Sequence, residues 1–264
     1  MTTLESLLIM LPYNCNSLSK LCIIHYALCF ALLFSACDSG DIVEKTFTVD
    51  DSGYVVKLTT RLIGADSLDS KYTLAIAGYA SGDNYARMQQ TLPAPDANGS
   101  VSIAMSNISE QLNTVEFVLS NRRRERILSL ATISLTDYDA ESRDTIRMEL
   151  GDIDVSMIGI LQRSVFDVAC IQCHGGNGGN GAANLNLTQG KAFANLIDVA
   201  STRKEGMKRV ASGNAEASLL HNILSEGGEG ILHVNHTEIL SNQFRENLYE
   251  VRQFIDDWIE RLKE

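Results

Sequence analysis

The hydrophobic periodicity of this 264-residue chain changes near residue 157. Before that point, apolar residues recur in short runs with strand-like alternation. These runs are Lys45–Val49, Tyr54–Leu62, Tyr72–Ile76, Val101–Met105, Thr114–Leu119, Arg126–Ile133 and Thr145–Leu150. Turn-forming residues separate them, for example at 51–53, 81–84 and 98–100. Repeated short strands with turns between them favour an antiparallel β-sandwich over an alternating strand–helix layout, so we expect one over residues 38–156.

Beyond residue 157 the apolar spacing becomes helical. Ile158, Leu161, Val165 and Val168 are three or four positions apart, as on one face of a helix. Further helices are expected at about 189–197, 215–224 and 241–262. The last carries an apolar stripe formed by Leu248, Val251, Ile255, Trp258, Ile259 and Leu262. The predicted fold class is therefore multidomain: an N-terminal all-β immunoglobulin-like sandwich and a C-terminal all-α domain over 157–264.

A C-x-x-C-H motif, Cys170-Ile171-Gln172-Cys173-His174, follows the first predicted helix. Two thiols three positions apart can both add across the vinyl groups of one haem, and the adjacent His174 is placed to bind the iron. Gly175 and Gly176 come next and can end the helix with a left-handed residue. The motif predicts a covalently bound haem c held by Cys170 and Cys173, with His174 as an iron ligand.

The other four cysteines lie in or beside an apolar leader. Residues 21–36 form an apolar run, which is shorter than the roughly 20 residues that a spanning helix needs and suits a signal sequence. The run ends in Leu33-Phe34-Ser35-Ala36-Cys37, which resembles a bacterial lipobox, although Phe34 stands where leucine is usual. We expect residues 1–37 to be a signal peptide with its lipobox, and Cys37 to carry a lipid anchor. The alternative is an uncleaved membrane helix.

The formal net charge is −11 and the isoelectric point is about 4.9. An acidic chain of this kind is not expected to bind nucleic acid, and a partner would present basic groups to it. With four cysteines near the leader and two in the motif, none remains for a structural disulfide framework.

Residues 157–264 resemble the small c-type cytochrome domain found at the C-terminus of many bacterial envelope proteins. The resemblance rests on the C-x-x-C-H with its glycines, and on several shorter matches. These are Asn184–Leu187, Arg209-Val210, Gly213-Asn214, Ser218–Leu220 and Trp258-Ile259. It implies a class I-like domain of three to five helices around one haem c.

The residue at the sixth coordination position departs from that family. Its members usually place a distal methionine in a loop shortly before the last helix. Here Met207 is the one methionine after the motif, and it lies too early in the chain. His233 falls on the methionine's place, so we expect ligation by His174 and His233, with His236 as the next candidate and Met207 as the third. An open sixth position remains an alternative.

These features predict a lipid-anchored cytochrome that faces the periplasm and passes single electrons between redox partner proteins of the cell envelope. No general base or nucleophile is evident beside the haem motif, which favours electron transfer over catalysis. A zinc-stabilised binding lipoprotein is one alternative, with zinc held by Cys170, Cys173, His233 and His236. A haem sensor or weak peroxidase is another, if the sixth position is open.

Overall fold

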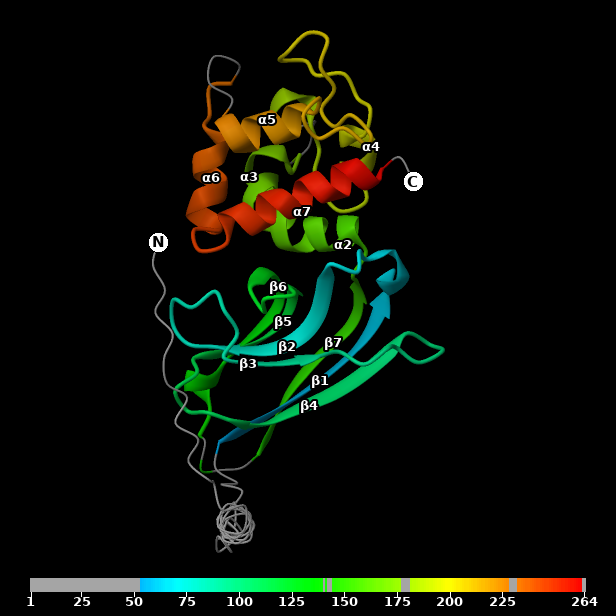
Figure 1. Cartoon of the computed structure of the whole chain (residues 1–264). Helices are drawn as coiled ribbons and strands as arrows, with labels where there is room; N and C mark the ends of the chain where they lie inside the picture. Colours follow the sequence, from blue (N-terminus) through cyan, green and yellow to red (C-terminus); the bar gives the residue numbers. More distant parts are fainter. Residues whose placement is uncertain (1–52, 140, 142–143, 177–180, 228–231, 263–264) are drawn as a thin grey trace, which may run out of the picture. The chain divides into compact units, whose positions relative to one another are not determined.

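The computed structural model describes residues 53–139, 141, 144–176, 181–227 and 232–262 (Figure 1). The predicted leader with Cys37, and the first predicted strand at 45–49, lie outside the described residues. Within the described part of the chain, no helix combines the length and the apolar character needed to cross a bilayer.

Seven strands form two sheets in the first half of the described chain. They are β1 (Tyr54–Ile63), β2 (Tyr72–Tyr79), β3 (Met88–Thr91), β4 (Ser100–Ile108), β5 (Thr114–Asn121), β6 (Arg126–Ser134) and β7 (Thr145–Asp154). One sheet has the order β4-β1-β7 and the other β3-β2-β5-β6. The pair β1–β7 is parallel and every other pair is antiparallel. We call residues 54–154 the sheet region.

Alternation explains most of these strands. In β1, Val56, Leu58 and Leu62 are buried while Arg61 and Ile63 are exposed, so that one face turns to the core. Strand β5 differs, because it lies between β2 and β6 and all residues from Val115 to Ser120 are buried. Six predicted strands are found, whereas the four-residue edge strand β3 was missed.

Short helices and irregular segments make up the second half, residues 157–262, which we call the C-terminal region. The α-helices are α2 (Met157–Leu161), α3 (Ile171–His174), α4 (Ala192–Leu196), α5 (Leu219–Glu226), α6 (His236–Gln243) and α7 (Leu248–Arg261). A π-helix over Gln162–Cys170 joins α2 to α3. The apolar stripe of α7 is buried, as its spacing predicts: Val251, Ile255, Trp258 and Ile259 are at most 3% exposed.

Helix α7 connects the two regions. The ring of Phe254 packs edge-on against Tyr72 of β2, with ring centroids 5.0 Å apart. The Asn247 side chain, just before α7, donates a hydrogen bond to the carbonyl oxygen of Ile127 in β6 at 2.6 Å. Arg261, at the other end of α7, pairs with Asp69 at 3.1 Å. One hydrophobic cluster runs from the sheets into the helices, from Val56 to Ile259.

The predicted fold class, an all-β immunoglobulin-like sandwich followed by an all-α cytochrome domain, is therefore wrong. The described chain has a mixed fold of two sheets and a partly helical C-terminal region. Between α4 and α5 the chain forms isolated β-bridges instead of a helix, such as Ile197 with Val210 and Ala200 with Lys208. Asp198 there has a φ of 55°, in the left-handed region, which is incompatible with a continuing α-helix. Apolar spacing alone did not reveal this irregular segment.

The predicted helix at 241–262 is in fact two helices. Phe244 leaves helical geometry, with φ −123° and ψ 39°, and its side chain is 9% exposed. Asn247, whose side chain is held by its hydrogen bond to the Ile127 carbonyl oxygen, is the N-cap residue of α7. Burial of Phe244 and the Asn247 hydrogen bond thus outweigh the helical pattern at this point.

Candidate functional site

The segment that delivers the C-x-x-C-H begins at a capped helix. Ser156 is the N-cap of α2, and its Oγ accepts a hydrogen bond from the Gly159 amide at 3.2 Å. The chain then widens into the π-helix, where the amide of Ile171 bonds to the carbonyl oxygen of Phe166, five residues back. This spacing changes the buried face: Phe166 is 1% exposed and Val168 is 39% exposed. The prediction that Val168 faces inward is wrong because the π-turns are wider than α-turns.

The two motif cysteines are free thiols in different surroundings. Cys170, at the end of the π-helix, is partly buried, and its Sγ lies 3.7 Å from the carbonyl oxygen of Val165. Burial, with smaller contributions from Asp167 and Cys173, raises the pKa of Cys170 to about 12. Cys173 is exposed.

His174 ends α3, and its imidazole is held from the backbone. Its Nδ1 lies 3.0 Å from the carbonyl oxygen of Ala182, while its own carbonyl accepts a hydrogen bond from the Leu187 amide at 2.8 Å. Burial is the main cause that lowers the pKa of His174 below its ordinary value. The ring is therefore neutral near pH 7, which is the form that binds metals.

Glycines let the chain turn back over His174. Gly176 has a φ of 59°, which fits the predicted left-handed ending of this helix. A Cβ added at Gly181 would lie 2.7 Å from the Cα of His174, so only glycine fits this close approach. The return segment thereby brings the Ala182 carbonyl to the imidazole.

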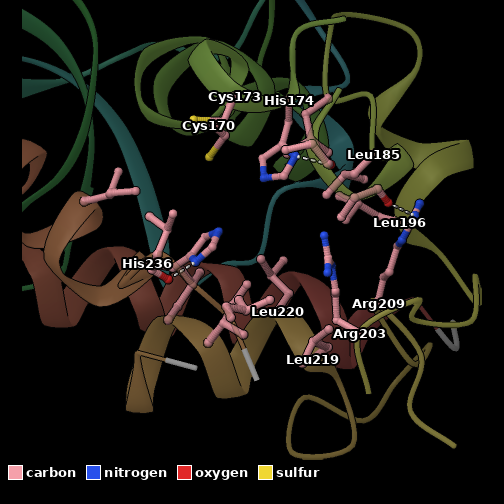
Figure 2. A pocket seen from close by; sticks show the side chains of 18 of the residues that line it. Cys170, Cys173, His174, Leu185, Leu196, Arg203, Arg209, Leu219, Leu220 and His236 are labelled. Carbon is pink, nitrogen blue, oxygen red and sulfur yellow. Dashed lines mark hydrogen bonds between the residues drawn. The ribbon is translucent and has the colours of Figure 1, made fainter. Parts of the chain in front are cut away.

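Cys170, Cys173 and His174 line one cavity of about 260 Å³ (Figure 2). This volume lies just below the range of about 300–1,000 Å³ for small-molecule sites. Apolar side chains from several elements form most of the remaining wall. They include Val165, Phe166, Leu185, Leu187, Leu196, Leu219, Leu220, Ile223, Leu224, Ile239, Leu240 and Ile255. Trp258 packs behind this wall against Phe166, with ring centroids 6.5 Å apart.

Two arginines also line the cavity, Arg203 and Arg209. The Arg209 guanidinium donates hydrogen bonds to the carbonyl oxygens of Asn195 at 2.8 Å and Ala183 at 2.9 Å. Arg209 therefore ties together two segments of the cavity wall. Lys208, its neighbour in sequence, pairs with Asp198 at 2.7 Å.

A second imidazole, His236, faces His174 across the cavity (Figure 2). The ring centroids are 6.3 Å apart and the ring planes differ by 27°. His236 is the first residue of α6, directly after the N-cap Asn235, whose side chain accepts a hydrogen bond from the Glu238 amide at 3.1 Å. The two rings thus come from two separate helices, α3 and α6.

The other candidate ligands lie in different positions. His233 lines the same cavity but is exposed, and the imidazole paired with His174 is that of His236. The sulfur of Met207 lies 3.6 Å from the side-chain nitrogen of Asn222. The Nδ1 of His221 lies 2.8 Å from the Asp256 carboxylate on α7.

The zinc alternative needs Cys170, Cys173, His233 and His236 to converge. Within the described residues, no group of three or more histidine, cysteine, aspartate or glutamate side chains is gathered as a metal site. Of these side chains and His174, the imidazoles of His174 and His236 lie opposite each other, with ring centroids 6.3 Å apart.

The sequence analysis ranked His233 above His236 as the partner of His174, although the sequence carries a signal that separates the two histidines. Asn235 followed three residues later by Glu238 is a helix-start pattern. This pattern places His236 on the first turn of a helix and leaves His233 in the preceding loop. Alignment on the usual methionine position favoured His233 because it counted residues and ignored the cap.

Comparison with models of known protein families found no match, and comparison with curated proteins found no relative.

Proposed function

We propose that the C-terminal region holds one covalently attached haem c and that the protein transfers single electrons. The observation that carries this proposal is that both thiols of the C-x-x-C-H, and the imidazole beside them, line one apolar cavity. A bound haem c supplies a one-electron ferric/ferrous couple. The proposal rests on these residues and not on an all-α cytochrome fold.

Attachment through the two cysteines balances without an external oxidant. Each thiol would add across one vinyl group: a sulfur–carbon bond would form, the vinyl double bond would become single, and the thiol hydrogen would go to the other vinyl carbon. The cysteines must enter this reaction as free thiols, and Cys170 and Cys173 are both free. Their separation along one helix end lets both sulfurs reach the same macrocycle.

The protein's own side chains prepare the cavity for such a group. The Ala182 carbonyl accepts a hydrogen bond from Nδ1 of His174, which leaves the Nε2 lone pair for the iron. Apolar walls keep water from the macrocycle, and burial of this kind is one of the factors that set a haem potential. Both effects suit electron transfer at a fixed site.

We further propose that the protein is anchored by a lipid on Cys37 and exchanges electrons with redox proteins of the cell envelope facing the periplasm. The support is the lipobox-like sequence together with a type of haem that is attached outside the cytoplasm. The net charge of −11 favours partners with basic surfaces.

Expression with a periplasmic haem c maturation system tests the proposal. We expect a red protein that keeps its haem on a denaturing gel, and loss of this band in a Cys170→Ser, Cys173→Ser variant. His221→Ala is the matched control, since His221 pairs with Asp256. A colourless wild-type protein, or one that carries zinc in place of haem, would contradict the proposal.

A further inference from the structure

The two imidazoles that face each other across the cavity have the separation of a pair that shares one metal ion. A metal bound by two imidazoles lies about 2 Å from each nitrogen, which puts the ring centroids about 6 Å apart. The centroids of His174 and His236 are 6.3 Å apart. The ring planes differ by 27°, and Figure 2 shows the two rings reaching toward each other from opposite walls.

In both rings, Nδ1 lies at a backbone carbonyl oxygen, so Nε2 is the nitrogen that can bind a metal. Nδ1 of His174 lies 3.0 Å from the Ala182 carbonyl oxygen, and Nδ1 of His236 lies 3.0 Å from the Val234 carbonyl oxygen. A carbonyl oxygen only accepts hydrogen bonds, so each Nδ1 carries the proton. In the neutral imidazole this tautomer leaves Nε2 as the nitrogen that can bind a metal, with the ring oriented by the backbone as in known metal-binding histidines.

His236 is held in place by its helix. The Asn235 cap fixes the first turn of α6, and the Thr237 hydroxyl donates hydrogen bonds to the carbonyl oxygens of Ile223 and Leu224 in α5, at 3.2 and 3.0 Å. Leu240, one turn further on, is 2% exposed. These contacts fix the wall of the cavity that carries the imidazole.

His233 has no comparable support. It is exposed, and it makes no hydrogen bond to any residue in the described part of the chain. Met207, the third candidate, has its sulfur near the Asn222 side chain. A ligand position needs a fixed donor atom, and among these three candidates in the described part of the chain, His236 is the one whose ring lies opposite His174.

We infer that His236 supplies the sixth ligand of the haem iron, opposite His174. This inference rests on the proposed haem c. It gives the sixth position to His236, whereas the sequence analysis predicted His233 there. Two imidazoles give a six-coordinate iron with no free position for carbon monoxide. They also give a lower reduction potential than a histidine–methionine pair, because a methionine ligand raises the potential. The site is then an electron carrier and not a gas sensor.

The test compares visible spectra of three haem-loaded variants, His236→Ala, His233→Ala and His221→Ala, with and without carbon monoxide. We expect the wild type to be low-spin and unchanged by carbon monoxide. His236→Ala should keep its covalent haem, become high-spin and bind one carbon monoxide per haem. Free imidazole should restore its low-spin spectrum. His233→Ala and His221→Ala should match the wild type.

A second variant covers the case in which His236→Ala fails to fold. His236→Met should stay low-spin with a reduction potential above that of the wild type. An unchanged low-spin spectrum in His236→Ala, or its loss in His233→Ala, would overturn the assignment while leaving the haem itself in place. Absence of covalent haem from the wild type would instead contradict the proposed function.

Discussion

The sheet region and the C-terminal region differ in what their apolar side chains contact. In the sheet region, Phe117 and Leu119 are fully buried in β5, between neighbouring strands. In the C-terminal region, Leu219 and Leu224 line a cavity with a cysteine pair and three imidazoles on its walls. The β5 side chains are covered by protein within the hydrophobic cluster that runs through both regions, whereas the cavity of the C-terminal region leaves apolar surface that a ligand could cover. Burial of that surface on binding would stabilise the region that holds it.

The largest expected difference between the regions is in hydrogen exchange with and without haem. In the Cys170→Ser, Cys173→Ser variant, amides of α5 and α6 should exchange faster than in the haem-loaded wild type. Amides of β5 should keep their protection, because that strand pairs with β2 and β6 on its two sides and is buried from Val115 to Ser120. Exchange measured by mass spectrometry checks this. Equal loss of protection in β5 would show that the regions do not differ as described.

Cys170 should react more slowly than Cys173 before haem is attached. Burial raises the pKa of Cys170 to about 12, which disfavours its thiolate at pH 8, and the thiolate is the nucleophile. Cys173 is exposed. Iodoacetamide followed by peptide mass spectrometry should therefore label Cys173 first. Equal labelling rates would contradict the buried position of Cys170.

A cavity in the sheet core should affect stability and leave the haem site alone. Phe117 is 0% exposed, and Phe117→Ala should lower the free energy of unfolding by about 3–5 kcal/mol. Urea unfolding measures this cost. The visible spectrum of the folded variant should match that of the wild type. A changed spectrum would mean that the sheet core shapes the haem pocket directly.

The contact between the regions should have a smaller effect. Asn247→Ala removes the 2.6 Å hydrogen bond to the Ile127 carbonyl and leaves that buried oxygen unpaired, a cost of about 1–3 kcal/mol. Asn242→Ala is the control, since Asn242 is exposed on α6. Equal stability of the two variants in urea would show that this contact does not couple the regions.

The smallest expected effect is a dependence of folding stability on acidic pH, caused by Asp198. Hydrogen bonds from Lys208 and then Ser212 lower the pKa of Asp198 from 3.8 to about 2. Because the folded-state pKa is depressed, its contribution is present above about pH 4 and is lost as the pH falls toward 2. Asp198→Asn should remove this small slope, and added salt should weaken it, since the pair is exposed. A wild-type melting temperature with the same acid slope as the variant would refute it.

Local sequence patterns predicted the elements better than their assembly. The strand segments and the buried stripe of α7 followed from periodicity, because each pattern reports which side of one element is buried. The mixed fold was not predicted, since the bridges between α4 and α5 join short stretches of an irregular segment that has neither helical nor strand-like apolar spacing. The π-helix also escaped prediction, because the pattern was fitted to α-helical spacing.

At the site, the sequence pointed to Cys170, Cys173 and His174 through a compact motif. The position of His236 depends on how α6 packs on α5 through Thr237, which no local spacing records. Counting from the usual methionine position led to His233, three residues earlier. The cap at Asn235 was the one local signal that separated the two histidines.

The visible spectrum of the reduced wild-type protein shows whether a covalent haem lies between His174 and His236. Recorded before and after addition of carbon monoxide, it should show a sharp low-spin α band that the gas does not change. A shift of the band under carbon monoxide would mean that the sixth position is open or weakly held. Such a shift would contradict ligation by His236.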